Sequence, residues 1–582
     1  MKLALFGAAV FVASSAFASG SSVVAEVGKE YWNLVLEDRI DLREELGLPI
    51  ESLPDVSDSR AKELAAKARV LLRRLEPVAP ESLEPEERLS LLVLRKELSN
   101  WVEAPKYSDF ALPVMPYTSP FSTIRRVLAD YKFAGEADAR RYLSLLDDLA
   151  RLTVTVEAKL RSSAGRGIVI PRDEIELLLP SLEPLAERSG ESPFRAAPSR
   201  LAAPGIDAAA FERQQAAKID GKVAPAFGRL LTYLRGDYRK AAPSGVGLSQ
   251  YPGGEAYYRY LVAYHTNSPL SPEEIHRYGL SEMERINREL DAVRQKVGFP
   301  GSLADFRRSL KTDVRFFPKT PEEIGDRLMA AVRRVEPKIP LFFSRIPKAP
   351  YGVRRLDPAL EGSMTFGYYQ VPTPGHPEGD YLFNGSRLSE RSLLNAPALI
   401  AHELVPGHHF QINLQSENES LPIYRRHLID VTAYVEGWGE YASALAGEMG
   451  LYDQPYDRCG RLAMEAFLSA RLVVDTGMNL LGWPRERAIA YMRDNTFETD
   501  LQISTETLRY SCDMPGQALA YKMGSRKFFE LREKARRELG PKFGIRRFHE
   551  AVLGSGALPM NVLETKVDEW IAAEKAAVQP RG

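Results

Sequence analysis

The sequence predicts a mainly α-helical fold with a small β element, and three observations lead to this expectation. Long stretches place apolar residues three and four positions apart, the spacing that lines one face of an α-helix. Strand-like segments are few and lie close together in a part of the chain rich in Pro and Gly. The 582 residues are 44% hydrophobic and 27% charged, a balance typical of globular proteins. On length alone, one large domain or two to three ordinary ones are possible.

Three segments carry the clearest helical patterns. Residues 57–77 (SDSRAKELAAKARVLLRRLEP) and 85–105 (PEERLSLLVLRKELSNWVEAP) separate apolar from polar faces and begin with Ser or Pro. In residues 271–302, Ser271 stands at the N-cap position, Pro272 follows, and acidic residues occupy the first turn. We expect this last helix to end before the Gly-Phe-Pro near its carboxyl end.

A small sheet or edge ribbon is expected just before the central motif, from strands at Tyr351–Arg354, Met364–Val371 and Asp380–Phe383. No repeat period or linker divides the chain, and Pro243–Gly254 is the best candidate boundary. We therefore predict an N-terminal helical half (19–250) and a second half (251–582) that carries the candidate functional residues. The two halves are expected to form the walls of one cleft.

The first residues, MKLALFGAAVFVASSAFASGSS, have the pattern of a secretory signal peptide. One Lys, an apolar run of about a dozen residues and Ala16-Phe17-Ala18 match its charged, apolar and cleavage regions. The run is shorter than the ~20 residues that span a bilayer, and no Cys follows the cleavage site. We expect residues 1–18 to be removed and the mature protein to be periplasmic or extracellular, without a membrane anchor.

Charge and cysteine content exclude two kinds of site. The formal net charge is −1, so the basic excess of nucleic-acid-binding proteins is missing and no nucleic-acid partner is expected. The two cysteines, Cys459 and Cys512, have no neighbouring second Cys and do not predict a cysteine metal site. They are expected to be buried thiols or to form one disulfide.

The segment HELVPGHH (402–409) begins like the zinc-protease signature H-E-x-x-H, but two additional residues precede its second histidine. In an unbroken helix His408 would point about 120° away from His402. Pro406 lacks the N–H that would bond to the carbonyl of His402, and Gly407 adds backbone freedom. A bulge or kink here would bring His408 to the position of the expected histidine.

A third ligand is expected downstream, because zinc is usually held by about four groups, with His and Glu among them. The segment YVEGWGEYA (434–442) supplies Glu436 and, one helical turn later, Glu440. We favour Glu436 as the ligand and expect Glu440 to support a ligand histidine from behind. Three of the eight histidines lie in the motif beside a Glu, which favours a metal site over a histidine-rich turn. The others are expected to be structural or surface residues: His265, His276, His376, His427 and His549.

Several blocks resemble the bacterial family known as domain of unknown function 885, in the clan of zinc metallopeptidases with a glutamate as third ligand (gluzincin-type). Its hallmark H-E-x-x-P-G-H-x-x-Q is similar to residues 402–411. The other matching blocks are YVEGWGEYA (434–442), RLVVDTGMNLLGW (471–483), RYSCDMPGQALAYKMG (509–524) and YHTNSPLSPEEIHRYGL (264–280). The resemblance spans most of the mature chain. It implies a large helical metallopeptidase-like fold with a deep cleft.

The resemblance implies that His402, His408 and Glu436 hold one Zn²⁺ per chain and that Glu403 is the general base. His409 is the alternative ligand or a hydrogen-bond donor to substrate, although the hallmark places the ligand directly after Pro-Gly. The family's D-T-G-x-H reads D-T-G-M-N here, so Asn479 replaces a histidine and cannot transfer a proton. This replacement is either structural or alters rate and substrate choice.

We therefore expect a secreted zinc metallopeptidase in which Glu403 takes a proton from the attacking water and returns it to the leaving amine. A strand within residues 365–386, just before the motif, is expected to bind extended peptide along its edge. Two alternatives are a noncatalytic peptide-binding protein on the same scaffold and a metal amidohydrolase or esterase for non-peptide substrates. Candidate donors to the developing oxyanion are Tyr521, Lys522, Tyr510, Arg509 and His409.

Overall fold

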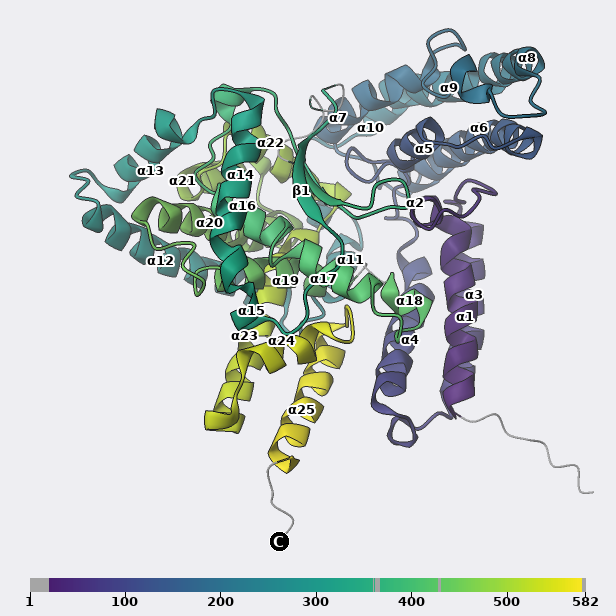
Figure 1. Ribbon diagram of the computed structural model, residues 1–582. Helices are drawn as coiled ribbons and strands as arrows, with labels where there is room; N and C mark the ends of the chain where they lie inside the picture. The colour runs from purple at the N-terminus through teal and green to yellow at the C-terminus, as the bar shows by residue number, and fades with distance from the viewer. Residues whose placement is uncertain (1–19, 359–360, 362–366, 428–430, 578–582) are drawn as a thin grey trace, which may run out of the picture.

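The computed structural model describes residues 20–358, 361, 367–427 and 431–577. Within these ranges the chain is mainly α-helical with a small three-stranded sheet (Figure 1), which confirms the predicted fold class. The predicted signal peptide, residues 1–18, lies outside the described residues, as does the start of the strand expected at Met364–Val371.

The helices and strands follow one another in three groups. The first group is α1 (Gly20–Asp38), α2 (Ile40–Glu45), α3 (Asp58–Leu75), α4 (Pro85–Glu103), α5 (Pro120–Ala129), α6 (Glu136–Ala164), α7 (Arg172–Leu182), α8 (Ala208–Lys218), α9 (Ala224–Tyr233) and α10 (Arg239–Ala241). The second is α11 (Gly254–Thr266), α12 (Pro272–Lys296), α13 (Leu303–Thr312), α14 (Pro321–Val335), α15 (Ile339–Phe342), β1 (Tyr351–Arg355), β2 (Gly367–Gln370) and β3 (Gly379–Phe383). The third is α16 (Ala396–Glu403), α17 (His408–Ser416), α18 (Ile423–Arg426), α19 (Thr432–Leu445), α20 (Pro455–Asn479), α21 (Arg485–Asn495), α22 (Asp500–Leu508), α23 (Ala520–Leu539), α24 (Ile545–Leu553) and α25 (Met560–Ala576).

The three helices expected from their capping residues are present as α3, α4 and α12. The side chain of Ser57 accepts the N–H of Arg60 at the start of α3, and α4 begins with Pro85. At α12, Ser271 and Glu274 form a reciprocal capping box. These contacts satisfy backbone N–H groups that the first helical turn leaves without partners.

The sheet lies at the three places where strands were expected. Its order is β1-β3-β2, with β1 parallel and β2 antiparallel to β3. The central strand β3 is buried along its whole length, whereas β1 and β2 are partly exposed edges. The edge β2 therefore keeps backbone groups available on the side away from β3.

Two large cores hold the helices together. The first combines residues from α1, α3 and α4 with residues from α14, α16, α19, α23 and α25, and the second is built mainly from α5 to α9. In Figure 1 the helices α5, α6, α8 and α9 project from the rest of the molecule at the upper right. Residues from both sides of position 250 share each core, so the division into halves at that position stays a prediction.

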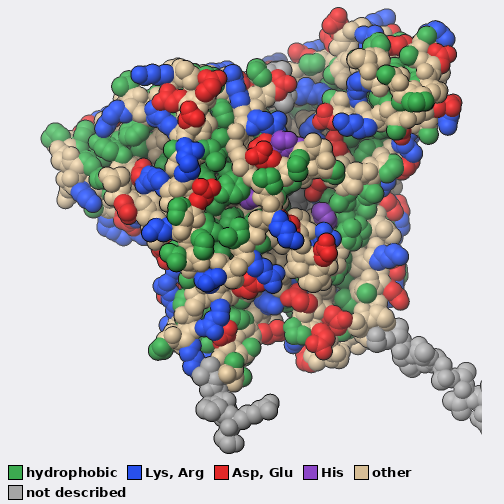
Figure 2. Space-filling model, viewed as in Figure 1, with side chains coloured by type: hydrophobic (Ala, Val, Ile, Leu, Met, Phe, Trp, Pro, Cys, Tyr) green, Lys and Arg blue, Asp and Glu red, His purple; other side chains and the backbone are tan. Residues whose placement is uncertain are grey.

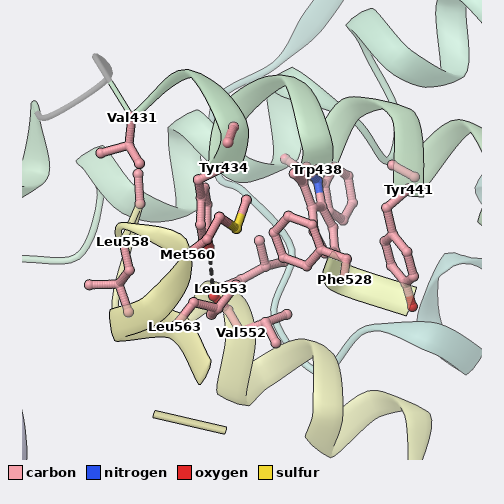
Figure 3. Close-up of a cluster of buried hydrophobic side chains, with 14 of the residues drawn as sticks. Val431, Tyr434, Trp438, Tyr441, Phe528, Val552, Leu553, Leu558, Met560 and Leu563 are labelled. Carbon is pink, nitrogen blue, oxygen red and sulfur yellow. Dashed lines mark hydrogen bonds between the residues drawn. The ribbon is translucent and has the colours of Figure 1, made fainter. Parts of the chain in front are cut away.

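The helix α19 lies at the centre of the first core. Figure 3 shows Tyr434, Trp438 and Tyr441 on one face of this helix, together with Phe528 of α23 and Val552 of α24. The Tyr434 hydroxyl donates to the carbonyl of Val552 at 2.5 Å. Burial of large aromatic side chains of this kind contributes strongly to stability, so α19 is a fixed element on which functional groups can be placed.

The surface carries charges of both signs, and both cysteines are buried. Figure 2 shows acidic and basic side chains intermixed over one face, with histidine side chains visible near its centre. Cys459 and Cys512 are buried free thiols. Among the helices of the described ranges, none combines the length and apolar character needed to cross a bilayer.

Glu174 of α7 gives the fold a predictable pH dependence. Its side chain is fully buried, one carboxyl oxygen accepts the N–H of Cys512 at 3.2 Å, and the other has no partner among the described residues. Burial raises its pKa to about 8. The protonated carboxyl therefore contributes fully to the free energy of unfolding below pH 4.5, the ordinary pKa of glutamate. This contribution is lost as the pH rises from 4.5 toward 8, at about 1.4 kcal/mol per pH unit.

We expect the variant Glu174→Gln to remove this loss, because glutamine keeps an acceptor for Cys512 and does not ionise. The urea midpoint of the variant should exceed that of the wild type at pH 8 and approach it near pH 5. Asp173→Asn, which changes the exposed neighbour on the same helix, is the control and should keep the wild-type slope. An unchanged slope in Glu174→Gln would contradict the assignment.

Candidate metal centre

The central motif forms two helices separated by a sharp turn. The helix α16 ends at Glu403 and α17 begins at His408, with non-helical backbone angles at Leu404 and Gly407 and a cis bond between Val405 and Pro406. The sequence predicts a bulge or kink within one helix, but the structure has a larger distortion, a complete break between two helices. Two additional residues, one of them a proline without an N–H, break the hydrogen-bonding pattern completely.

Glycine at position 407 allows the turn to fold back on itself. A Cβ atom at this position would lie 1.7 Å from the carbonyl oxygen of His402, which no side chain tolerates. Because the chain returns so closely, the rings of His402 and His408 lie side by side, with centroids 4.7 Å apart and planes at 83°. The turn thus brings the imidazoles of His402 and His408 next to each other although they are six residues apart, as predicted from the motif.

Glu436 reaches the two histidines from α19. Its Oε2 atom lies 3.4 Å from Nε2 of His402 and 3.4 Å from Nε2 of His408. On the same face of α19, Ser443 donates to the carbonyl of Ala398 in α16 at 2.8 Å.

Two further features of α19 bring it close to the motif. Trp438 donates from its indole N–H to the carbonyl of Pro406 at 3.0 Å. At Gly439 a Cβ would lie 2.8 Å from Cε1 of His402, so the missing side chain leaves room for the imidazole. The helix is therefore fixed to both sides of the turn.

The three groups fit a zinc ion in type, number and spacing. One ligand atom from each of His402, His408 and Glu436 lies within 4.8 Å of the others. Two ligands at 2.0–2.1 Å from a tetrahedral zinc are about 3.4 Å apart, the spacing found from Oε2 to each Nε2. The Oε2 atom of Glu436 is buried and has no hydrogen-bond partner among the described residues, as expected for an atom that faces a cation.

Electrostatics at the site follow from burial and close approach. Burial alone would raise the pKa of Glu436, but the two imidazoles outweigh it and hold that pKa well below its usual value. Burial would lower the pKa of His408, but Glu436 outweighs it and raises that pKa. A negative carboxylate beside two basic nitrogens is the charge arrangement that binds a divalent cation.

Glu403 lies next to this group at the end of α16 and is partly exposed. Burial raises its pKa, while His408, His402 and the backbone N–H of Tyr369 lower it. The contact with Tyr369 places the edge strand β2 beside the Glu403 carboxyl. A carboxyl group with a raised pKa is suited to accept and return a proton near neutral pH.

His409 points away from Glu436. Its Nε2 pairs with the carbonyl oxygen of Ala349 at 3.1 Å and its Nδ1 with the hydroxyl of Tyr369 at 3.0 Å. Since Nε2–H donates to the carbonyl, Nδ1 accepts from the hydroxyl and the ring is neutral. Burial also lowers its pKa to about 4. The structure thus places His408, and not His409, beside His402 and Glu436.

Tyr521 of α23 is the oxyanion-donor candidate that reaches the site. Its ring stacks on that of His402, with centroids 6.1 Å apart and planes at 15°. Burial and the charge of Glu436 raise the pKa of its hydroxyl, so the hydroxyl remains a hydrogen-bond donor. Its side chain is partly exposed, which leaves it accessible to a bound substrate.

Lys522 and Glu440 belong to a different network. The Nζ atom of Lys522 lies 2.8 Å from Glu282 and 3.8 Å from Glu465. Glu440 forms a buried ion pair with Arg461 at 2.6 Å, so the expected support of a ligand histidine by Glu440 is wrong. The carboxylate is already committed to a guanidinium group, and neither His402 Nδ1 nor His408 Nδ1 has a partner among the described residues.

Asn479 has a structural role. Its amide nitrogen donates to the carbonyl of Tyr510 at 2.7 Å and to that of Asp475 at 3.0 Å, and its oxygen accepts the N–H of Leu248 at 2.8 Å. These bonds join the end of α20 to two neighbouring segments. They leave little hydrogen-bonding capacity for a substrate.

Two features were missed by sequence reasoning. A second group of possible ligands consists of His376, Glu378 and Asp380, but Asp380 is already paired with His376 at 2.8 Å and Arg354 at 2.9 Å. The other is Arg471, whose guanidinium carbon lies 4.8 Å from the centroid of the Tyr521 ring. Its position in an otherwise apolar stretch of α20 was the available signal.

Comparisons with known proteins agree with this architecture. The family model described as "Bacterial protein of unknown function (DUF885)" matches residues 42–567. Among solved structures, "the putative lipoprotein from Colwellia psychrerythraea" is 25% identical with a TM-score of 0.86, covering 95% of this chain and 100% of that chain. A "putative lipoprotein of unknown function from Shewanella oneidensis" is 16% identical with a TM-score of 0.73, covering 94% of this chain and 99% of that one. No curated protein matches the chain.

Proposed function

Since the chain belongs to the DUF885 family of bacterial proteins, we propose on the chemistry of its candidate site that it is an exported zinc-dependent metallopeptidase. The observation that carries this proposal is the convergence of His402 Nε2, His408 Nε2 and Glu436 Oε2 from three helices. Glu403 lies beside them as a carboxyl that is not needed as a ligand. Two imidazoles, one ligand carboxylate and one free carboxylate form the minimal set for metal-assisted hydrolysis.

His402, His408 and Glu436 would hold the ion, which when bound acidifies water and polarises a carbonyl group. Glu403 accepts the proton of the attacking water and delivers it to the leaving nitrogen. Burial raises its pKa, which makes this carboxylate a stronger base than an exposed glutamate. Tyr521, stacked against His402, donates its hydroxyl hydrogen to the charge that develops on the carbonyl oxygen.

The strand β2 supports a peptide as substrate. It is an edge of the sheet, and the backbone N–H of Tyr369 faces Glu403. An extended peptide that pairs with this edge would pass the carboxyl group with its backbone held by hydrogen bonds. This mode of binding recognises backbone groups and so favours amide substrates over unrelated esters.

Export is part of the proposal. The two solved structures named above are each described as a "putative lipoprotein", and lipoproteins are exported proteins. The predicted signal peptide at residues 1–18 agrees with this. A protein that enters the periplasm or the medium meets peptides there, which is compatible with the proposed activity.

The first test is the zinc content of the purified mature protein. We expect about one zinc per chain in the wild type and a loss of zinc in Glu436→Ala. The matched control is Glu378→Ala, which removes a carboxylate from the second His-containing group and should keep the zinc. A chelator should abolish peptide hydrolysis, measured by mass spectrometry on a mixed peptide library, and added zinc should restore it. A wild-type protein without tightly bound metal would contradict the proposal.

A further inference from the structure

We infer that Arg509 and Arg471 form a subsite beside the metal centre that binds a carboxylate of the substrate. The inference rests on the proposed function for the identity of the substrate as a peptide, and it adds the substrate class: peptides with a free carboxylate one or two residues beyond the cleaved bond. The subsite is built on Tyr521, the residue that links the arginines to His402.

Tyr521 contacts both a proposed metal ligand and one of the arginines. Its ring stacks on His402 at 6.1 Å, and the Arg471 guanidinium carbon lies 4.8 Å from the centroid of the same ring. Arg471 and Arg509 both lower the pKa of the Tyr521 hydroxyl against the opposing effects of burial and Glu436. Both positive charges therefore lie close to the hydroxyl that faces the reacting group.

The two arginines share one hydrogen-bonded carboxylate partner. Glu506 is the carboxylate that pairs with both arginines, accepting from Arg471 at 3.0 Å and from Arg509 at 3.4 Å. Glu506 also accepts from the hydroxyl of Tyr510 and from Gln502 at 3.1 Å. Two guanidinium groups share one carboxylate that also accepts from two other donors, so neither has a hydrogen-bonded carboxylate of its own and a ligand carboxylate can pair with one of them.

Besides Glu436, three further carboxyl groups lie within electrostatic reach of the two arginines. Burial raises the pKa of Glu498 and of Asp475 to about 7 and that of Asp513 to about 6. Asp475 is occupied by the hydroxyl of Tyr258 and the N–H of Gly516. Asp513 is bonded to the backbone N–H of Tyr117 and the hydroxyl of Thr118. None of these three is hydrogen-bonded to Arg471 or Arg509.

Arg509 is the member that a ligand can reach. Its side chain keeps 17% of its surface exposed, compared with 6% for Arg471. Its Nη2 atom donates to Gln517 at 2.7 Å, which fixes the direction of the planar group. Arg471 is held behind it by Tyr510 and Glu506, so Arg509 makes the direct contact and Arg471 adds charge.

A guanidinium at this distance selects a carboxylate near the cleaved bond. An extended residue spans about 3.3–3.6 Å, so the width of one aromatic ring corresponds to one or two residues of a substrate. The ligand carboxylate is either the C-terminus of the peptide or the side chain of an Asp or Glu just after the bond. Bidentate pairing with arginine recognises both in the same way.

The test measures peptide binding to the Glu403→Gln variant, because this variant should bind the peptides without cleaving them. The zinc content is determined on the same samples. Fluorescent peptides ending in a free acid or in an amide are titrated by anisotropy. We expect the free acid to bind more tightly, and Arg509→Gln to weaken only the free acid by about 10- to 100-fold. Arg485→Gln is the matched control, because Arg485 is equally exposed at 17% and contacts the same helix α22; it should leave both affinities unchanged.

A third peptide, amidated but with glutamate as its last residue, identifies the source of the carboxylate. Tight binding of this peptide that is lost in Arg509→Gln assigns the subsite to side chains, and weak binding assigns it to the C-terminus. Arg509→Lys keeps the charge but not the fork and should give an intermediate loss. Equal binding of all three peptides by a zinc-loaded protein would overturn the subsite alone, whereas a protein without zinc would overturn both the subsite and the proposed function.

Discussion

Glu403→Gln is expected to lower peptide turnover by about 10²- to 10⁴-fold while the zinc content stays at the wild-type level. Glutamine has the size of glutamate but cannot accept a proton, and Glu403 is not among the three groups that converge on one point. Stopped assays on the best library peptide and metal analysis of the same sample measure the two quantities. Binding of that peptide should change much less than turnover, because β2 and the rest of the site are untouched.

The same chemical change at Glu378 provides the control for Glu403→Gln. Glu378 lies near a histidine and an aspartate in the second group of possible ligands, so Glu378→Gln should preserve both zinc and turnover. Full activity in Glu403→Gln would remove the general-base role. Loss of zinc in that variant would mean instead that Glu403 acts as a ligand.

The predictable part of this protein is the part that local chemistry determines. The capping residues Ser57 and Ser271 mark where α3 and α12 begin, since a backbone N–H without a partner needs a nearby side-chain oxygen. The strands beside the motif are found where Pro and Gly punctuate short apolar runs. At the site, the donor types of His402, His408 and Glu436 predict that these three side chains meet, and the structure brings them together.

The remaining features depend on partners distant in sequence. The i, i+4 spacing of Glu436 and Glu440 places both on one side of α19, yet Arg461 pairs with Glu440 and thereby removes it from the metal group. Tyr521 and Lys522 are adjacent, but a step of about 100° along α23 directs one toward His402 and the other toward Glu282. No local rule reveals which neighbour each side chain meets.

The same reasoning applies to Asn479. Its sequence context leaves a structural and a functional explanation equally open, because an amide serves either. The bonds to Tyr510, Asp475 and Leu248 favour the structural one. They also explain why an amide suits the position. The Asn479 amide donates two hydrogen bonds and accepts one, whereas a neutral histidine has only one donor and one acceptor, at fixed angles.

His408→Ala and His409→Ala are expected to differ strongly, although the residues are adjacent. His408→Ala removes one of the three proposed ligands and should weaken zinc binding by more than about 100-fold, since loss of a residue that merely supports a ligand costs about 10- to 100-fold. Turnover should fall with the zinc content. Competition with a chromophoric chelator measures the affinity of each variant.

His409→Ala should keep its zinc, because both ring nitrogens are engaged elsewhere: one with Ala349 before β1 and one with Tyr369 in β2. Removing the ring takes its partner from the partly buried carbonyl of Ala349, at about 1–3 kcal/mol. The Tyr369 hydroxyl loses one of two partners and keeps Asn413, which loosens the edge strand that places an N–H beside Glu403. We therefore expect a lower melting temperature and a higher KM, with kcat less affected. The reverse result, zinc lost in His409→Ala and kept in His408→Ala, would require the turn after Pro406 to present the other histidine and would exclude the ligand set proposed for this site.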